Sequence, residues 1–246
     1  MAKRADRTTD LSGTFGYARV GPDERELRIR RVFDAVAPRY DLMNDLMSLG
    51  IHRLWKRRFA RIALADDPRV VVDLAGGTGD IAALMADGRR EVVVCDPSLP
   101  MMTHGRRRGI TGVRWLAGQG ERIPVASAAA DAVTISFGIR NVTSLEATLA
   151  EILRVLRPGG RFHCLEFSEA WAPVRPFYNL FSFTVIPRLG AWVARNPEAY
   201  AYLLESIRRF PDQEQFKALL ERAGFADVRY RNLSFGIAAI HTGTRT

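Results

Sequence analysis

Residues 70–80 of this chain, VVVDLAGGTGD, constrain its fold more than any other segment. Residues that favour strands lead into Asp73 and then into a glycine cluster, and apolar residues recur at helical spacing from Ile81 to Met85. This order predicts a strand, a tight turn and a helix. Because a backbone without side chains can approach a ligand closely, the turn is a candidate cofactor site.

Strands and helices are expected to alternate along the chain after this point. The strands are predicted near residues 70–74, 92–95, 113–116, 131–136 and 161–167, and the helices near 80–87, 98–107 and 145–155. The turn from Leu156 to Gly160 should close the last helix and begin the next strand. A helix over 212–223 and strands at 227–233 and 236–243 should finish the sheet as a hairpin. The pattern predicts an α/β fold, with a mainly parallel sheet covered by helices on both faces.

The segments around this core suggest one domain with additions. Residues 1–22 are polar and predict a flexible N-terminal arm, although Phe15 and Tyr17 favour docking of part of it. Residues 23–246 should form a single domain, which begins with about three helices before residue 60. Residues 169–210 interrupt the alternation, and their apolar, proline-containing sequence predicts an inserted helical lid.

Composition limits the classes of protein. The 246 residues are 47% hydrophobic and 26% charged, as in a soluble globular domain. No run reaches the roughly 20 apolar residues needed to span a bilayer, and the N-terminus lacks a secretory signal, so a cytoplasmic protein is expected. Cys95 and Cys164 lie in apolar runs without metal-ligand spacing, which predicts buried thiols and no metal site.

The formal charge of +9 is partly clustered, in two basic groups at residues 53–61 and 106–108. Such clusters attract nucleic acid or anionic lipid, and they can equally be a solvated arginine-rich surface.

The glycine cluster leaves more than one cofactor open. Gly77 and Gly79 fit a relaxed dinucleotide pattern, and Asp96 ends the next strand, where a carboxylate can accept both hydroxyls of a ribose. Asp80 would repel a pyrophosphate but tolerate a cationic sulfonium, which favours S-adenosylmethionine over a nicotinamide dinucleotide. A tight turn that binds nothing is the structural alternative.

Longer sequence blocks narrow this choice. They are RYDLMNDLMSLGIHRLWKRR at 39–58, DLAGGTGD at 73–80, TISFGIRNV at 134–142, RVLRPGGRFHCLEFS at 154–168 and YLLESIRRFPDQ at 202–213. With these blocks the chain resembles the ubiquinone/menaquinone-biosynthesis C-methyltransferase family, a branch of the class I S-adenosylmethionine-dependent methyltransferases. The resemblance implies a Rossmann-like seven-stranded sheet. It also implies C-methylation of a polyprenylated quinol ring, either 2-methoxy-6-polyprenyl-1,4-benzoquinol, demethylmenaquinol or both.

The resemblance also implies which residues bind S-adenosylmethionine. The turn would cradle the methionine part, Asp96 would bind the ribose, Gln119 and Gly120 would flank the adenine, and Ser136 would lie beneath the cofactor. The turn residues in question are Asp73, Gly76, Gly77, Thr78 and Gly79. The chain departs from the family pattern at Gln119, where Asn or Asp is usual, and at DPSLPMM (96–102), where a run like DINxxML is usual.

The acceptor side is expected in other blocks. Arg140 and Asn141 follow the fourth strand, and Arg140 could polarise a water, stabilise a developing phenolate or clamp a loop. His52 titrates in a useful range and is a candidate proton acceptor, or else a packing residue. An N-terminal signature with helical spacing would place several of its residues on one side of a lid; its members are Tyr40, Asp41, Asn44, His52 and Trp55, of which Tyr40 and Asn44 are candidates for substrate binding. Glu166, Tyr178 and Tyr202 are further candidates for the quinol pocket.

A polyprenyl substrate would lie in the membrane. The apolar segment Phe177–Trp192, beside basic clusters, predicts peripheral contact with the inner face of the cytoplasmic membrane, although core packing or a dimer interface would use the same residues. A homodimer or a quinone-biosynthesis complex fits this setting, and nucleic acid is not expected. The competing functions are a nicotinamide-dependent oxidoreductase and a non-catalytic lipid-binding or assembly protein with the same fold.

Overall fold

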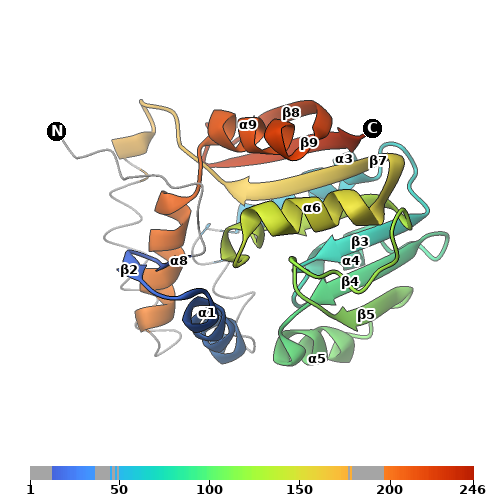
Figure 1. Cartoon of the computed structure of the whole chain (residues 1–246), viewed down its shortest axis with the longest axis horizontal. Coiled ribbons are helices and arrows are strands. Elements are labelled where there is room, and N and C mark those ends of the chain that lie inside the picture. The colour runs from blue at the N-terminus through green and yellow to red at the C-terminus, as the bar shows by residue number, and fades with distance from the viewer. Residues whose placement is uncertain (1–12, 37–44, 46–47, 49, 177, 179–196) are drawn as a thin grey trace.

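A computed structural model describes residues 13–36, 45, 48, 50–176, 178 and 197–246. These residues form one central sheet with helices packed around it (Figure 1). The sheet has seven strands in the order β5-β4-β3-β6-β7-β9-β8. Its strands are β3 (Val70–Leu74), β4 (Glu91–Asp96), β5 (Val113–Ala117), β6 (Ala130–Ser136), β7 (Leu156–Phe167), β8 (Phe225–Leu233) and β9 (Ala238–Arg245). Pairs from β5 to β7 are parallel, and β9 pairs antiparallel with both β7 and β8. The prediction of a mainly parallel sheet that ends in a hairpin is confirmed.

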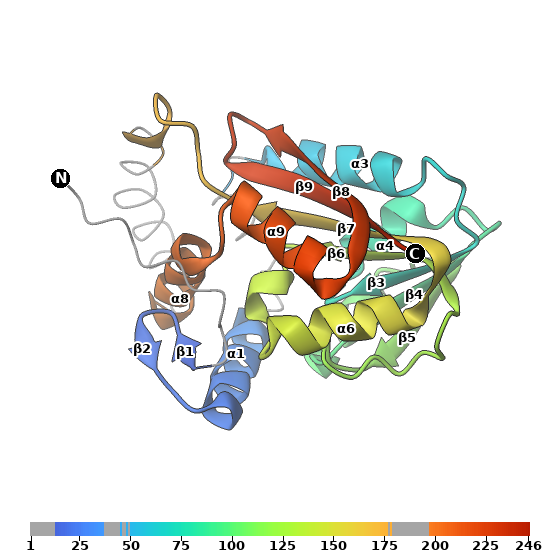
Figure 2. The ribbon, with the colours of Figure 1, turned by 45° about the horizontal axis from the view of Figure 1, so that its top comes forward.

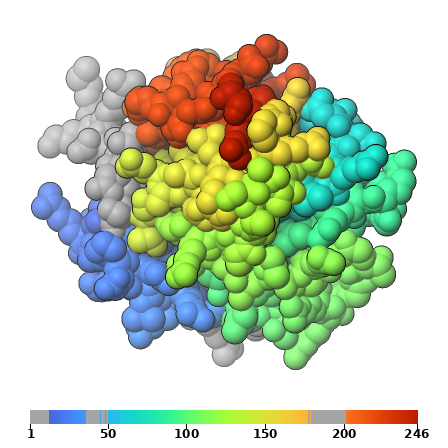
Figure 3. All heavy atoms as spheres, turned by 45° about the vertical axis from the view of Figure 1, so that its right-hand side comes forward, coloured from blue at the N-terminus to red at the C-terminus, as the bar shows by residue number. Residues whose placement is uncertain are grey.

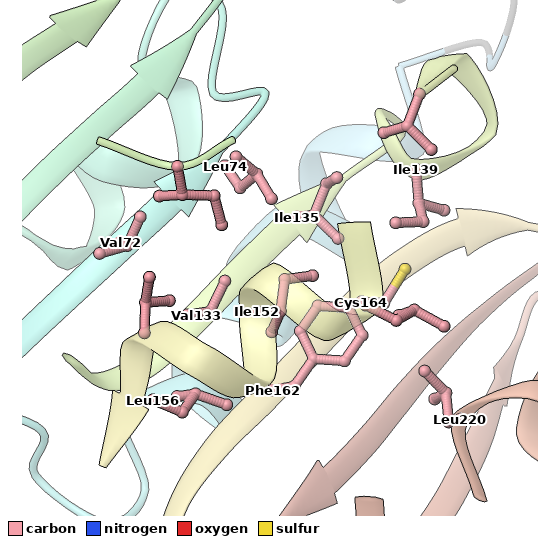
Figure 4. Packing of buried hydrophobic residues seen from close by; sticks show 14 of the residues in the cluster. Val72, Leu74, Val133, Ile135, Ile139, Ile152, Leu156, Phe162, Cys164 and Leu220 are labelled. Carbon is pink, nitrogen blue, oxygen red and sulfur yellow. The ribbon is translucent and has the colours of Figure 1, made fainter. Parts of the chain in front are cut away.

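Helices cover both faces of this sheet (Figure 2). They are α1 (Pro22–Val36), α3 (His52–Ala63), α4 (Asp80–Met85), α5 (Leu99–Arg107), α6 (Leu145–Val155), α8 (Pro197–Arg209) and α9 (Gln213–Ala223), with a 3-10 turn η2 (Ile139–Asn141). One face packs on α6 and α9 through residues such as Ile152 and Leu220, as Figure 4 shows. The other face packs on α3 and α4 through Phe59 and Met85. The cysteines Cys95 and Cys164 are free and fully buried in the first of these cores, as predicted.

The strand order puts β3 at the centre, with β4 on one side and β6 on the other. From β3 the chain continues to β4 and β5 on one side, and after β5 it crosses back to β6 on the other side of β3. In open α/β sheets ligands bind at this switch point, beyond the carboxyl ends of the strands. The fold thus directs attention to the loops that follow β3, β4 and β6.

Several predicted boundaries are wrong at turns. Strand β7 begins at Leu156, so the Pro-Gly-Gly turn lies within it, and its pairing with β6 shifts register between Ala130 and Ala132. Gly159 has a φ of +78°, which permits this irregularity. Strand β9 begins at Ala238 instead of residue 236, because Ser234 to Gly236 all have positive φ and form the hairpin turn.

The N-terminal segment is more ordered than a flexible arm. β1 (Thr14–Phe15) and β2 (Ala18–Arg19) form a small antiparallel sheet within the predicted arm. Phe15 is buried and its ring stacks on Tyr202 of α8, with centroids 4.2 Å apart, whereas Tyr17 is exposed. The chain is therefore docked from Thr14 onward, and residues 1–12 lie outside the described part.

α1 and α8 lie side by side at one end of the sheet, and the space-filling view shows the N-terminal segment (blue) against the central part of the chain (Figures 1 and 3). α8 belongs to the predicted helical insertion, of which Phe177 and residues 179–196 lie outside the description. Most of the predicted N-terminal helical region between Pro38 and Gly50 lies outside it too. In the parts that are described, we find no helix with the length and apolarity to cross a membrane.

Candidate active site

A cavity lies over the carboxyl ends of β3, β4 and β6. Its walls include the loop after β3, the loop after β4, the residues after β5 and β6, and one side of α1. The lining residues are Asp73–Thr78, Asp80, Ile81, Asp96–Ser98, Met101, Gln119–Glu121, Ser136–Gly138, Asn141–Thr143, Lys56 of α3 and, from α1, Glu26, Ile29, Arg30 and Phe33. The cavity therefore brings together the predicted glycine turn, the predicted adenine residues and Asn141.

The glycine loop is closely packed against its own strand. A Cβ at Gly76 would lie 2.8 Å from the Asp73 Oδ2 atom and 3.1 Å from a Val94 methyl group, which leaves no room for a side chain. Gly79 has a φ of +79° and precedes α4. Gly76 and Gly77 line the cavity without side chains, as a cofactor cradle requires, whereas Gly79 lies outside the cavity wall.

Two cavity residues that are not glycine also have positive φ. Ala75 (φ +51°) follows β3, and Phe137 (φ +57°) follows β6. A residue other than glycine in this conformation costs about 1 to 3 kcal/mol, and such strain concentrates at functional sites. The backbone therefore turns sharply at the two places where β3 and β6 end at the cavity.

Asp96 organises the loops around the cavity. Its Oδ2 atom accepts the Gly77 N–H at 2.8 Å, and its Oδ1 atom accepts the Ser98 N–H at 2.8 Å. Burial raises the pKa of Asp96 to about 6, although both N–H groups favour the ionised form. The predicted ribose carboxylate therefore faces the cavity with its position fixed by two backbone bonds.

Asp73 lies below the loop and is almost completely buried. Its Oδ1 atom accepts the Thr134 hydroxyl at 2.8 Å, and within the described residues its Oδ2 atom has no hydrogen-bond partner. Burial raises the pKa of Asp73 to about 7. The Ser136 hydroxyl, also on the cavity wall, is likewise buried without a described partner. Both oxygens are available to a ligand that carries N–H or O–H groups.

Gln119 is bonded to α1. Its Nε2 atom donates to the Glu26 carboxylate at 2.5 Å, so this side chain ties the loop after β5 to the helix that covers the cavity. Gly120 lies beside it, and a Cβ there would be 3.0 Å from Thr148. Gln119, which stands where Asn or Asp is usual in the family, thus makes a side-chain contact with α1.

Asp80 does not have the role that the sequence predicted. Its carboxylate accepts a hydrogen bond from Lys56 Nζ at 2.7 Å and another from Arg108. Burial would raise its pKa, but the two cations outweigh that effect and hold the pKa at about 2. Since this cluster carries one net positive charge, Asp80 gives no reason to exclude a pyrophosphate, and that part of the case against a dinucleotide was wrong.

Arg140 lies in the η2 turn and is buried, one residue before the cavity-lining Asn141. Its Nη1 atom donates to the Phe137 carbonyl at 2.7 Å and to the Glu166 carboxylate at 2.5 Å. Among the described residues, Arg140 Nε and Glu166 Oε2 have no partner. Burial raises the pKa of Glu166, while the guanidinium favours its ionised form. The predicted pair of Arg140 and Asn141 is therefore held at the cavity edge, with only Asn141 in the wall.

Asn141 is held by Tyr202. The Tyr202 hydroxyl donates to Asn141 Oδ1 at 3.0 Å, and burial raises the pKa of Tyr202 to about 12. Tyr202 does not line the cavity but contacts a residue that does. The stacking of Phe15 on Tyr202 extends this contact to the N-terminal hairpin.

Arg25 of α1 is a residue that the sequence reading missed. It is 2% exposed, and its guanidinium donates to the carbonyl groups of Thr14 (2.7 Å), Val142 (2.5 Å) and Arg140 (3.2 Å). It therefore fixes the backbone of the η2 turn from the N-terminal helix. The available signal was its spacing, because Arg25 shares the buried face of α1 with Ile29 and Val32.

The structure does not bring His52 into the cavity wall. Its Nδ1 atom is bonded to the Ser48 hydroxyl at 2.7 Å, and burial, with the nearby Lys56 charge, lowers its pKa to about 4. Trp55 is buried and donates to Ser234, so it joins α3 to the hairpin turn. Tyr178 is half-buried and does not line the cavity. Tyr40, Asp41 and Asn44 lie outside the described residues.

The sheet order, the glycine loop and the carboxylate after β4 define the class I S-adenosylmethionine-dependent methyltransferase fold. A solved structure from Thermotoga maritima, described as a SAM-dependent methyltransferase and possible histamine N-methyltransferase, has a TM-score of 0.65 at 20% identity and covers 89% of this chain and 100% of that one. The [4+2]-cyclase SpnF has the same TM-score at 15% identity, covering 89% and 96%. At these identities the likeness concerns the fold alone.

The chain belongs to the ubiE/COQ5 methyltransferase family, whose sequence model matches residues 22–245. It is 63% identical over 96% of its length to the ubiquinone/menaquinone biosynthesis C-methyltransferase UbiE of Rubrivivax gelatinosus, of which 94% is covered. The protein of the same description from Acidiphilium cryptum is 47% identical, with both chains covered completely. The chain is thus a methyltransferase, and the oxidoreductase alternative is not favoured.

Proposed function

We propose that this protein transfers a methyl group from S-adenosylmethionine to a ring carbon of a polyprenylated quinol in respiratory quinone biosynthesis. The observation that carries the proposal is the 63% identity, over nearly the whole chain, to a relative described as a ubiquinone/menaquinone biosynthesis C-methyltransferase. The acceptor is a benzoquinol, a naphthoquinol or both.

The residues of the cavity fit the cofactor. Gly76 and Gly77 line the cavity without side chains, and the Asp73 and Ser136 side chains offer oxygens without described partners. The loop from Gly76 to Gly79 would hold the methionine part, Asp96 the ribose, and Gln119 with Gly120 the adenine. When bound, S-adenosylmethionine supplies an electrophilic methyl group.

The chain's own residues must prepare the acceptor ring. A ring carbon becomes nucleophilic when a quinol hydroxyl loses its proton, so the site must stabilise the negative charge that develops on that oxygen. Arg140 stays charged and is a poor base, and because it lies behind the cavity wall, its role is to stabilise this charge through a water. Asn141, fixed by Tyr202, lies in the wall and would orient the ring.

Substrate access favours peripheral contact with the inner face of the cytoplasmic membrane, because a polyprenyl tail partitions into lipid. Two large apolar side chains support this, Trp171 (52% exposed) and Phe235 (61% exposed), whose ring centroids lie 5.9 Å apart. Co-sedimentation with anionic liposomes at low salt is expected. Phe235→Asn should weaken it roughly 3- to 10-fold, whereas Tyr17→Asn, at another exposed aromatic, should not. No binding by the unaltered protein would contradict the proposal.

Quinone profiling of cells that lack the protein tests the function. Accumulation of a demethylated benzoquinone or naphthoquinone is expected, and its identity would name the acceptor. A normal quinone profile would contradict the proposal. The alternative of a non-catalytic assembly protein predicts that the purified protein binds the cofactor but gives no methylated quinol.

A further inference from the structure

Lys56 is a buried cation in the cavity wall that no step described so far requires. It lies on α3, it is 7% exposed, and it lines the cavity beside Asp80 and Ile81. Its Nζ atom donates to Asp80 Oδ2 at 2.7 Å. An ammonium has three N–H groups, and Asp80 occupies one of them.

The charges around the cavity make Lys56 distinctive. The lining carboxylates are Glu26, Asp73, Asp80, Asp96 and Glu121, and the lining cations are Lys56 and Arg30. Arg30 is exposed on α1, so Lys56 is the buried cation of this wall. A ligand group that carries negative charge would be repelled elsewhere in the cavity and attracted here.

Asp80 orients Lys56 without cancelling the charge of the cluster. Arg108, at the end of α5, bonds to the other oxygen of the same carboxylate and does not line the cavity. Two cations and one carboxylate leave a net charge of +1, and Lys56 is the cation of the cluster that lines the cavity, next to Asp80. The cluster therefore offers a positioned ammonium to a ligand.

Lys56 lies toward the end of the cavity that the methionine part of the cofactor would occupy. It adjoins the residues that follow the glycine loop and lines the same cavity as Asp73, which lies beneath that loop. Gln119 and Gly120, assigned to the adenine, follow β5 at the edge of the sheet, whereas the glycine loop follows the central β3. The methionine part carries one anionic group, its α-carboxylate.

We propose that Lys56, oriented by Asp80, binds the α-carboxylate of S-adenosylmethionine and so selects for the complete amino-acid part of the cofactor. The proposal rests on the cofactor assignment made above. It also explains why a lysine lies at this wall when the surrounding lining is acidic.

The test compares two ligands that differ by the carboxylate alone, S-adenosylmethionine and decarboxylated S-adenosylmethionine, by titration calorimetry. The unaltered protein should prefer the complete cofactor. Lys56→Met should weaken binding of the complete cofactor by about 10- to 100-fold, the range expected for a hydrogen bond between charged groups. The same variant should weaken binding of the decarboxylated ligand by less than about 3-fold. Lys56→Arg should keep most of the preference.

Arg108→Gln is the matched control, because Arg108 is the other cation bonded to Asp80 and does not line the cavity. This variant should leave the ratio of the two affinities unchanged. Equal losses for both ligands in Lys56→Met, or no loss for either, would overturn the proposal and leave the cofactor assignment intact. If the unaltered protein binds both ligands equally well, the proposal is overturned without any variant. If it binds neither, the cofactor assignment itself fails.

Discussion

The glycine loop after β3 and the η2 turn after β6 meet at the same cavity, but different kinds of contact hold them. In the loop, the Gly77 N–H bonds to Asp96 at the end of the adjacent strand β4, and Asp73 accepts from Thr134 on the adjacent strand β6. Both contacts follow from strand order. The loop is therefore in place once the parallel sheet has formed.

The η2 turn depends on elements from both ends of the chain. Its contacts come from Arg25 of α1, Glu166 of β7 and Tyr202 of α8. None of these residues is adjacent to the turn in sequence. The comparison teaches that the proposed cofactor half of the site is fixed by the sheet, whereas the proposed acceptor half is fixed by helices α1 and α8 together with strand β7.

The largest effect should come from the acceptor half. The double variant Arg140→Met/Glu166→Gln removes the charge that stabilises a developing phenolate and avoids leaving a buried carboxylate unpaired. Turnover should fall by about 100- to 1000-fold, as for other lost charge-stabilising donors. Affinity for S-adenosylmethionine, measured by calorimetry, should change by less than about 3-fold. A parallel loss of cofactor affinity would show that the two halves are not separate.

A smaller effect is expected at the contact between α1 and the turn. Arg25→Gln removes a charged donor from the carbonyl groups of Arg140 and Val142, and the turnover number should fall by about 10- to 100-fold. Arg28→Gln, on the same helix but in an exposed pair with Glu24, is the control and should have less than about a 2-fold effect. An equal turnover for both variants would contradict the long-range support of the turn.

A change in the proposed cofactor half should show the opposite pattern, a loss of cofactor affinity with little change in turnover. Gly76→Ala places a Cβ 2.8 Å from Asp73 Oδ2, so the loop must shift, and the free energy of unfolding should fall by about 1 to 3 kcal/mol. Cofactor affinity should fall with it, while turnover at saturating cofactor should change little. Gly13→Ala, which meets nothing within 4 Å, should leave both quantities unchanged. Retained affinity in Gly76→Ala would remove the loop from the cofactor site.

The smallest effect concerns pH and Asp73, whose pKa is raised to about 7 by burial. Its neutral form favours folding, so this contribution to the stability of the ligand-free protein is present at low pH and is lost as the pH rises toward 7. The cofactor's ammonium group favours the ionised form, so binding at pH 7 should release about half a proton. Calorimetry in buffers of different ionisation enthalpy measures this release, and Asp73→Asn should abolish it. Proton uptake on binding would contradict the assignment.

The sequence predicted the sheet and the cofactor loop well, because strand alternation and glycine spacing are local patterns. The strand β3 has the predicted bounds, and Asp96 ends the next strand as expected. The role of Asp80 was not predictable, since its partners Lys56 and Arg108 lie 24 and 28 residues away in sequence. The boundaries at Leu156 and Ala238 depended on backbone conformation at turns, which residue type alone does not settle.

The acceptor half was predicted only as a list of residues. The motif around Arg140 and Asn141 was visible, but its support by Arg25 arises from the packing of α1, and many arginines in this chain are merely exposed. His52 looked suitable because of its usual pKa, and burial beside Lys56 lowers that pKa to about 4. Such effects depend on which segments meet in three dimensions.

Transfer of an isotopically labelled methyl group from S-adenosylmethionine to a demethylated quinol, with the purified protein and lipid vesicles, is the most direct test of the central claim. The label is expected on a ring carbon of the reduced quinol and not on the oxidised quinone, because only the quinol can develop the phenolate charge that Arg140 stabilises. Cofactor binding without labelling of either a benzoquinol or a naphthoquinol would contradict the claim, and so would equal labelling of the quinone.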